Sequence, residues 1–336
     1  MANKNNMLNA ARIRRKDDFY TYLADIEKEL RYYRPHFKDK VVLCNCDDPR
    51  SSNFFRYFTM NFELLGLRKV IATCYKNQDV DLFSQGTAEK ALYQIYEGDK
   101  NGNRKVDDEE IEVKYLDGDG DFRSKECVEL LKQSDIVVTN PPFSLFREFI
   151  CLLAKYEKKF LIIGNVNAVT YKEVFPLIMR NELWLGASIH SGDRKFGVPD
   201  DYPLDATTCG IDEDGRRYIN VKGVRWFTNL DYPQRHTDIP LYKKYTPEEF
   251  PTYDNYAAIE VGKTSDIPCD YDDIMGVPIT FLDKYNPQQF EMIGCSDNGA
   301  IADQYKLPHF KRHNEPYLKG TKVYKRIFIR RRNNED

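Results

Sequence analysis

Hydrophobic positions in the first two-thirds of the chain follow two alternating patterns. Short apolar runs that end in polar or turn-forming residues are typical of buried strands, and the stretches between them are long enough for helices. This alternation predicts an α/β fold built on a doubly wound parallel sheet. The expected strands are Val41–Cys44, Val70–Cys74, Ile111–Leu116, Ile136–Thr139 and Phe160–Gly164, and the expected helices cover about residues 17–33, 52–65, 80–95, 124–133 and 144–155.

The alternation fades after about residue 170. Residues 193–218 are polar and rich in turn formers, and Val224–Leu230 has the pattern of one more strand. Beyond residue 237 follows a long irregular stretch with one compact apolar piece, Gly276–Leu282. We therefore expect a larger domain over residues 1–236 and a smaller, loop-rich region over residues 237–336.

Charge and composition narrow the class of protein only slightly. The net charge of −3 neither requires nor excludes a polyanionic partner. Basic residues cluster at both ends of the chain, which fits either solvated tails or phosphate contacts. The eight cysteines form no CxxC pair, and the N-terminus has no signal-like apolar stretch. Reduced thiols, a cytoplasmic location and no membrane span are therefore expected.

Polar loops follow the expected strands at positions where a ligand site would form. In a doubly wound sheet the carboxyl ends of the strands line that site, so we expect the loops to build one pocket. Their distinctive residues are Asn45, Asp47 and Asp48 after the first strand, Asp121 and Phe122 after the third, Asn140 to Phe143 after the fourth, and Asn165 after the fifth.

The segment Asn140-Pro141-Pro142-Phe143 carries the most specific chemical signal. Its two prolines remove backbone donors and fix φ, so the carbonyl groups point in rigid directions. The oxygens of the Asn140 side chain and of Pro141 would accept from a planar amine such as that of adenine, freeing its lone pair to attack a sulfonium methyl. Phe143 would stack on a base extruded from a duplex. The alternative is an ordinary Asn-Pro turn.

The neighbouring loops suit a methyl donor that carries adenosine but no phosphate. Asp47 and Asp48 stand where a dinucleotide fold has its glycine-rich phosphate loop, and the chain has no GxGxxG motif. The alternative for this acidic pair is a solvated turn. Asp121 suits an adenine amino group, and Phe122 suits the face of its ring.

Two Asp-rich loops imitate calcium-binding loops. In residues 99–110 the required glycine is replaced by Arg104, and in residues 117–128 it is replaced by Phe122. The first loop is followed by an expected strand, which favours a β-hairpin that turns near Gly102. No metal is expected.

With these residues in place, the chain resembles the N6-adenine DNA methyltransferases, and in particular the EcoRI modification methylase family. The resemblance implies a Rossmann-like doubly wound methyltransferase sheet with a smaller C-terminal target-recognition region. It also implies S-adenosylmethionine as the methyl donor and double-stranded DNA as the substrate of a chain that acts as a monomer. The matching pieces are residues 17–21, 44–50, 52–55, 118–123, 134–147, 159–163, 226–230 and 275–290.

Site residues follow from the resemblance one by one. Phe19, Tyr20 and Thr21 resemble the element that contacts the methionine end of the donor. Asn45, Asp47 and Asp48 match the first-strand loop, Asp121 and Phe122 the adenine-binding pair, and Asn140, Pro141, Pro142 and Phe143 the catalytic tetrad. Asn165 and Trp226 fall on the substrate side, although Trp226 also fits a buried core position. The second strand ends in Thr73-Cys74-Tyr75 without the usual acidic ligand, so the ribose contact is unassigned.

Other acceptors fit the same motif. The geometry demands only a planar nitrogen, so RNA or a protein glutamine is the chief alternative to DNA, and a DNA-binding protein that has lost methyl transfer is a second. The resemblance favours DNA and a place in a restriction-modification system or as a solitary or phage methylase. A cognate restriction endonuclease would then be a functional partner rather than a physical one.

Overall fold

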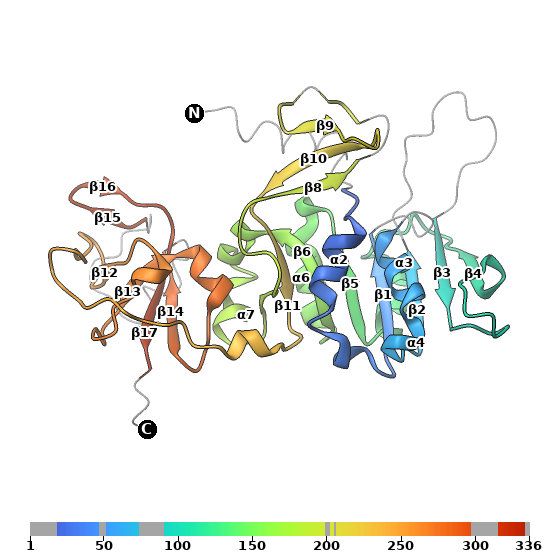
Figure 1. The fold of residues 1–336 in the computed structure, drawn as a ribbon, viewed down its shortest axis with the longest axis horizontal. Coiled ribbons are helices and arrows are strands. Elements are labelled where there is room, and N and C mark those ends of the chain that lie inside the picture. The colour runs from blue at the N-terminus through green and yellow to red at the C-terminus, as the bar shows by residue number, and fades with distance from the viewer. Residues whose placement is uncertain are drawn as a thin grey trace. The chain divides into compact units, whose positions relative to one another are not determined.

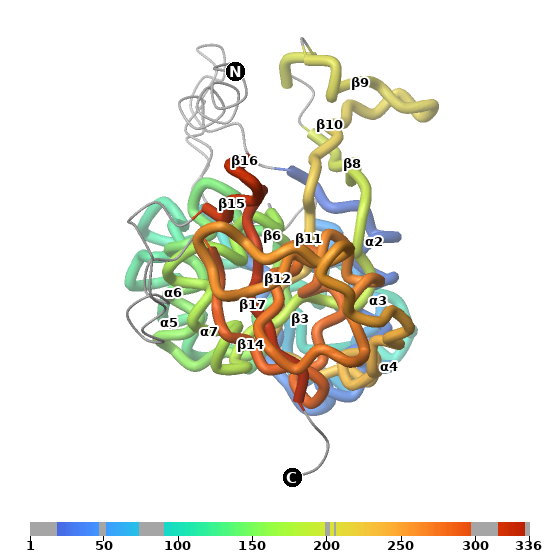
Figure 2. Tube along the Cα trace, turned by 90° about the vertical axis from the view of Figure 1, so that its left-hand side faces the viewer, coloured from blue at the N-terminus to red at the C-terminus, as the bar shows by residue number. Residues whose placement is uncertain are grey.

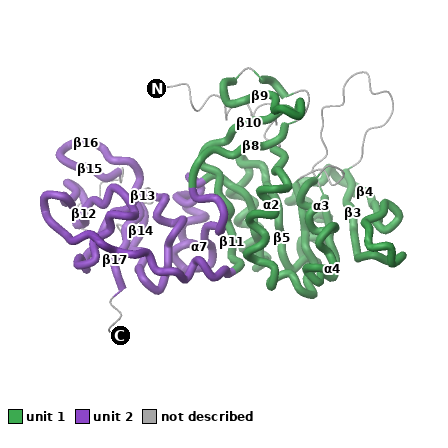
Figure 3. The backbone as a smooth tube through the Cα atoms, in the orientation of Figure 1, with its two compact units in different colours: residues 1–165, 191–230 green, residues 166–190, 231–336 purple. Residues whose placement is uncertain are grey.

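The computed structural model describes residues 19–46, 52–73, 91–198, 202–204, 206–296 and 315–332. The chain divides into two compact units (Figure 3), one from residues 1–165 and 191–230, the other from residues 166–190 and 231–336. The sequence places the division near residue 237 and does not separate residues 166–190 from the first unit. The assignment of residues 166–190 to the second unit depends on contacts between segments far apart in the chain, and local sequence patterns carry no signal of such contacts.

A large mixed sheet forms the core of the first unit (Figure 1). The strands β2, β1, β5 and β6 pair in parallel, whereas β3, β4 and β11 are antiparallel to their neighbours. The central strands are apolar and buried, as a parallel sheet covered on both faces requires. In sheet order the first unit contributes β4 (Ile111–Tyr115), β3 (Leu92–Tyr96), β2 (Lys69–Thr73), β1 (Val41–Asn45), β5 (Ile136–Thr139), β6 (Lys159–Asn165) and β11 (Val224–Thr228).

The helices of the first unit begin and end at residues suited to those positions. The Ser52 hydroxyl accepts from Phe55 N at the start of α3, and Gly66, at φ 61°, ends α4 in the left-handed region. The Ser124 hydroxyl caps α5 in the same way. The helices are α2 (Leu23–Leu30), η1 (Arg34–Phe37), α3 (Asn53–Met60), α4 (Phe62–Leu65), η2 (Asp108–Glu110), α5 (Lys125–Gln133), η3 (Phe143–Leu145) and α6 (Phe146–Lys155).

One expected helix is wrong in its described part. Leu92–Tyr96 forms strand β3, which pairs antiparallel with β4 at the edge of the sheet. Leu92 and Tyr96 are its buried residues. The length of the stretch between the expected strands, on which the helix was predicted, does not distinguish a helix from an edge strand. The hairpin expected around Gly102 is confirmed by the same pairing. In its loop the Asp99 carboxylate accepts from the backbone N–H groups of Gly102 and Arg104, both at 2.6 Å.

A small antiparallel sheet lies in residues for which the sequence predicts only turns. Its strands are β8 (Asp193–Gly197), β10 (Arg217–Lys222) and β9 (Cys209–Ile211), in that order. Figures 1 and 2 both show it projecting from the body of the first unit. Most of its residues are partly or fully exposed, so the strands lack the apolar alternation by which sequence patterns are recognised.

The second unit is built around a four-stranded sheet in the order β12 (Ile259–Glu260), β13 (Met275–Pro278), β17 (Arg326–Arg331) and β14 (Phe290–Cys295). Arg326–Arg331 of the basic C-terminal stretch therefore lies in an interior strand rather than in a solvated tail. Its other elements are η4 (Val166–Thr170), α7 (Phe175–Met179), β7 (Trp184–Leu185), η5 (Pro233–His236), η6 (Thr264–Asp266), η7 (Ile279–Lys284), β15 (Tyr317–Leu318) and β16 (Thr321–Lys322).

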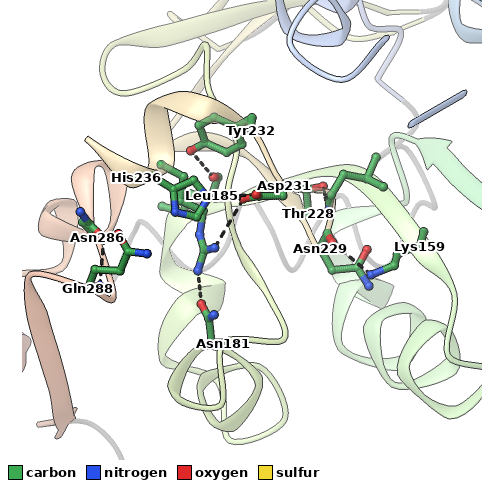
Figure 4. Close-up of polar contacts among 12 residues, drawn as sticks. Lys159, Asn181, Leu185, Thr228, Asn229, Asp231, Tyr232, His236, Asn286 and Gln288 are labelled. Atoms are coloured by element: carbon green, nitrogen blue, oxygen red, sulfur yellow. Dashed lines mark hydrogen bonds and ion pairs between the residues drawn. The ribbon is translucent and has the colours of Figure 1, made fainter. Parts of the chain in front are cut away.

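Buried polar contacts tie the second unit together. The Arg326 guanidinium contacts the Glu260 carboxylate at 2.5 Å with both side chains largely buried, and Tyr253 donates to the same carboxylate. Figure 4 shows another cluster, in which the Tyr232 hydroxyl donates to the Leu185 carbonyl at 2.9 Å. Among the helices of the described residues, none is long and apolar enough to cross a membrane.

Candidate active site

The side chain of Asn140 is fixed at the carboxyl end of β5. It is buried, and its Nδ2 donates to the backbone carbonyl of Phe19 at 2.6 Å. The preceding residue, Thr139, donates its hydroxyl to the backbone carbonyl of Asn45 at the end of β1. Because the amide nitrogen points to Phe19, the amide oxygen is directed elsewhere. The strand ends thus hold Asn140 in one orientation.

The two prolines that follow play different parts in the turn. The Pro142 carbonyl accepts from the N–H of Leu145 at 2.9 Å and starts the η3 turn, which leads directly into α6. Among the described residues no N–H or O–H group donates to the Pro141 carbonyl. Of the two proline carbonyls, that of Pro141 is therefore the one that remains for a ligand.

The Phe143 ring of the Asn140–Phe143 segment packs against two other aromatic side chains. The ring centroid of Phe143 lies 6.0 Å from that of Phe19 and 6.5 Å from that of Phe196, with edge-to-face geometry in both pairs. Phe19 and Phe196 are buried, whereas Phe143 is partly exposed. We call these three residues the aromatic cluster. It leaves Phe143 as the member accessible to a substrate.

The segment Phe19–Thr21 is held in place from two further sides. Tyr20 forms a two-bond bridge with Gly197 of β8, at 2.9 Å in each direction. The Thr21 carbonyl accepts from the side chain of Asn53 at 2.8 Å. Two side-chain oxygens of expected site residues, Thr21 Oγ1 and Asn45 Oδ1, are buried without a hydrogen-bond partner among the described residues. Such atoms are costly unless a ligand satisfies them.

The backbone turns sharply where β1 ends. Cys46 has φ 84°, in the left-handed region that favours glycine, and its N–H donates to the Thr73 carbonyl at 3.0 Å. The first-strand loop therefore makes the glycine-like turn without a glycine. Asp47 and Asp48, which follow, lie outside the described residues.

Asp121 and Phe122 are each engaged by neighbours. The Arg123 guanidinium bonds the Asp121 carboxylate through Nε at 2.9 Å and a terminal nitrogen at 2.6 Å. Hydrogen bonds with Asp121, and then with Glu148, raise the pKa of Arg123. The Phe122 ring is buried and packs edge-to-face on Phe149 with centroids 5.1 Å apart.

The remaining expected site residues lie on the next two strands. Asn165, at the end of β6, donates from Nδ2 to the Lys222 carbonyl at 2.9 Å. Trp226 in β11 is fully buried, and its ring centroid lies 6.1 Å from that of Phe54. In the part of the chain that is described, no three His, Cys, Asp or Glu side chains form a group able to hold a metal ion.

Comparison with known proteins decides the family. The profile described as "Adenine-specific methyltransferase EcoRI" matches residues 7–332. The type II methyltransferase M.EcoRI of Escherichia coli is 52% identical over 312 residues, covering 91% of this chain and 95% of that protein. The type II methyltransferase M.MpnI of Mycoplasma pneumoniae is 38% identical over 334 residues, covering 97% and 98%. No solved structure matches.

The chain belongs to the EcoRI adenine-specific methyltransferase family. The family, fold class and enzyme class expected from the sequence are thereby confirmed, and the chain is an adenine-specific DNA methyltransferase. The roles of individual site residues in this EcoRI-type methylase stay predictions.

Sequence reasoning missed three groups that contact the expected site residues. The Phe19 carbonyl that fixes Asn140 is a backbone atom, which carries no residue-specific signal. Phe196 lies in the sheet that sequence patterns did not reveal. Arg123 directly follows the Asp121-Phe122 pair, so its position was a signal that could have been used.

Proposed function

We propose that this chain transfers a methyl group from S-adenosylmethionine to the N6 amine of an adenine flipped out of double-stranded DNA. The observation that carries the proposal is the hydrogen bond from Asn140 Nδ2 to the Phe19 carbonyl. It commits the amide nitrogen to the protein, so Asn140 presents its oxygen to an amine. A side chain free to rotate would offer the wrong end for part of the time.

Asn140 and Pro141 act together on the target amine. Both oxygens accept its hydrogens, which favours a tetrahedral nitrogen whose lone pair points at the methyl group. This is stabilisation by preorganised dipoles, and a single such contact contributes roughly 10²- to 10³-fold in rate. The lone pair would form the N–C bond as the S–C bond breaks to leave a neutral thioether, and the methylated nitrogen would then release its proton to solvent, so no general base is needed before the transfer. The bound donor supplies an electrophilic methyl group on a sulfonium centre.

Phe143 receives the flipped base. Its ring is partly exposed, whereas Phe19 and Phe196 support it from the protein side with centroids 6.0 and 6.5 Å away. Because its neighbours already hold the Phe143 ring in place, the ring loses little conformational entropy when a base stacks on it. We also propose Asn165 and Trp226 as substrate-binding residues. Trp226 is fully buried, so it would contact a base only if its packing opened.

The donor site is proposed at Phe19–Thr21, Asn45 and Asp121, together with Phe122 and the acidic residues Asp47 and Asp48. The buried Thr21 Oγ1 and Asn45 Oδ1 support this placement, because each lacks a partner among the described residues and suits the polar groups of the donor. A buried unsatisfied polar group costs about 1–3 kcal/mol, which a bound donor would recover. These residues fit S-adenosylmethionine, and no metal takes part in the proposed site.

Residues 237–336 are proposed as the target-recognition region. Tyr242 and Tyr324 support this role, because their side chains are 83% and 60% exposed and aromatic surfaces suit contact with nucleic acid. We propose that the chain acts as a monomer on cytoplasmic DNA. Its relatives M.EcoRI and M.MpnI are type II methyltransferases, which favours a restriction-modification system with a separate endonuclease as functional partner.

Incubation with tritium-labelled S-adenosylmethionine and unmethylated DNA, bulk RNA or protein extract tests the acceptor. Label recovered as N6-methyladenine in DNA supports the proposal, whereas label only in RNA or in protein glutamine contradicts it. Asn140→Ala should abolish transfer and leave donor binding, measured by calorimetry, within about twofold, because Asn140 acts on the base. Near-full activity of Asn140→Ala would refute its assigned role.

A further inference from the structure

Arg123 lies at the centre of a small charged network beside the proposed adenine-binding pair. Its Nε and one terminal nitrogen contact the Asp121 carboxylate at 2.9 and 2.6 Å, and its other terminal nitrogen contacts Glu148 of α6. Its guanidinium carbon also lies 5.3 Å from the centroid of the Phe122 ring. One side chain thus touches both members of the pair and links them to α6.

We propose that Arg123 is a positioning residue that orients the Asp121 carboxylate toward the 6-amino group of the donor's adenine. This inference rests on the proposed function, which places that adenine at Asp121 and Phe122. A side-on, two-bond contact from a planar guanidinium fixes the plane of a carboxylate, which a single ammonium group does not. Glu148 holds the far end of the guanidinium and so keeps Arg123 in place.

A surface ion pair without such a role would behave differently. Exposed pairs contribute little to stability, and the chain offers a matched example in Lys132 and Glu129 of α5, which are 2.7 Å apart. The side chains of that pair are 48% and 54% exposed, against 47% and 53% for Arg123 and Glu148. Glu129→Gln is therefore the control for removal of an ion pair as such.

The test measures, by calorimetry on the full chain without DNA, binding of two thioethers, S-adenosylhomocysteine and S-inosylhomocysteine. They differ at the purine 6-position, where the inosyl compound has an oxygen in place of the amino group that Asp121 would bind. A hydrogen bond to a charged group corresponds to about 10- to 100-fold in Kd, so the unaltered chain should prefer the adenosyl compound by that factor. Arg123→Lys should reduce the preference to within about threefold.

Further variants separate positioning from a structural role. Glu148→Gln should lower the preference in the same direction, and Glu129→Gln should leave it unchanged. With Asp121→Ala already present, Arg123→Lys should have no additional effect, because Arg123 acts through Asp121. An Arg123→Lys chain that keeps the full preference overturns the inference.

The proposed function can fail independently of this inference. An unaltered chain that discriminates between the two thioethers yet methylates no DNA contradicts the proposed acceptor and leaves the role of Arg123 standing. An unaltered chain that shows no preference overturns the placement of adenine at Asp121 and the role of Arg123 with it.

Discussion

Asn140→Asp replaces the amide nitrogen of the proposed catalytic side chain by oxygen and tests why the chain uses an amide there. In the native protein Asn140 Nδ2 donates to the Phe19 carbonyl at 2.6 Å. An ionised aspartate would place a carboxylate oxygen against that carbonyl oxygen in a buried position. The variant thus loses a hydrogen bond and gains repulsion at nearly constant volume.

The cost of this substitution depends on pH. Burial without a partner raises the pKa of a carboxyl, by as much as about 3 units in strongly buried cases. Because the folded-state pKa is then above the unfolded value of about 3.9, the folded state binds more protons, and its stability falls as pH rises between the two values. At about 1.4 kcal/mol per unit, a shift of about 3 units corresponds to a loss of about 4 kcal/mol above the raised pKa.

Thermal unfolding and single-turnover methyl transfer, each followed from about pH 5.5 to about pH 8.5, would measure these effects. This range brackets the raised pKa. We expect Tm of Asn140→Asp to fall by roughly 10 °C relative to the native protein at the alkaline end and by about half as much at the acidic end. Transfer should fall by about 10²-fold or more. Asn140→Ala, which buries no charge, should lose transfer without the pH-dependent loss of stability. Native Tm and transfer within about threefold at alkaline pH would refute the role of the Phe19 contact.

Substitutions at three further positions test the packing around the site and the second unit. Gly164→Ala would place a Cβ 2.4 Å from the Phe146 ring at the start of α6, so we expect a loss of about 1–3 kcal/mol in urea unfolding and slower transfer; a variant equal to the native chain in both would contradict this. Cys46→Gly should be tolerated at φ 84°, whereas Cys46→Val should destabilise the first unit by about 1–2 kcal/mol. Equal stabilities of the two variants would show that the turn is unstrained. Glu260→Gln should cost about 3–5 kcal/mol in the second unit by leaving Arg326 buried without a charged partner, and a change below about 1 kcal/mol would argue against a buried ion pair.

The parallel core of the fold could be predicted because its strands carry their own signal. Val41–Asn45 and Ile136–Thr139 are continuous apolar runs that end in polar loops, and the structure places both in the centre of the sheet. The edge hairpin was only half recognised, because the stretch before its second strand is long enough for a helix and a helix was expected there, whereas Leu92–Tyr96 forms strand β3. The small sheet was missed since most residues of its strands are partly or fully exposed.

The candidate site likewise contains residues that the sequence predicts and contacts that it does not. Asn140 and Phe143 were recognisable because a rigid Asn-Pro-Pro turn after a buried strand has few structural explanations. The contacts that orient them come from the Phe19 carbonyl and from Phe196, which are distant in sequence and carry no motif. The basic stretch near the C-terminus carries no such signal: its composition fits a tail or a phosphate contact, whereas Arg326 pairs with Glu260 and belongs to an interior strand of the second unit.

The central claim is that Asn140 directs methyl transfer to adenine N6 in DNA. The most direct measurement is base-resolved sequencing of modified nucleotides in genomic DNA from a methylase-deficient bacterial host that expresses either the native chain or Asn140→Ala. We predict N6-methyladenine at one recurring short sequence with the native chain and none with Asn140→Ala. Methylation on cytosine, no DNA methylation by a folded native chain, or the same adenine pattern from both chains would contradict the account.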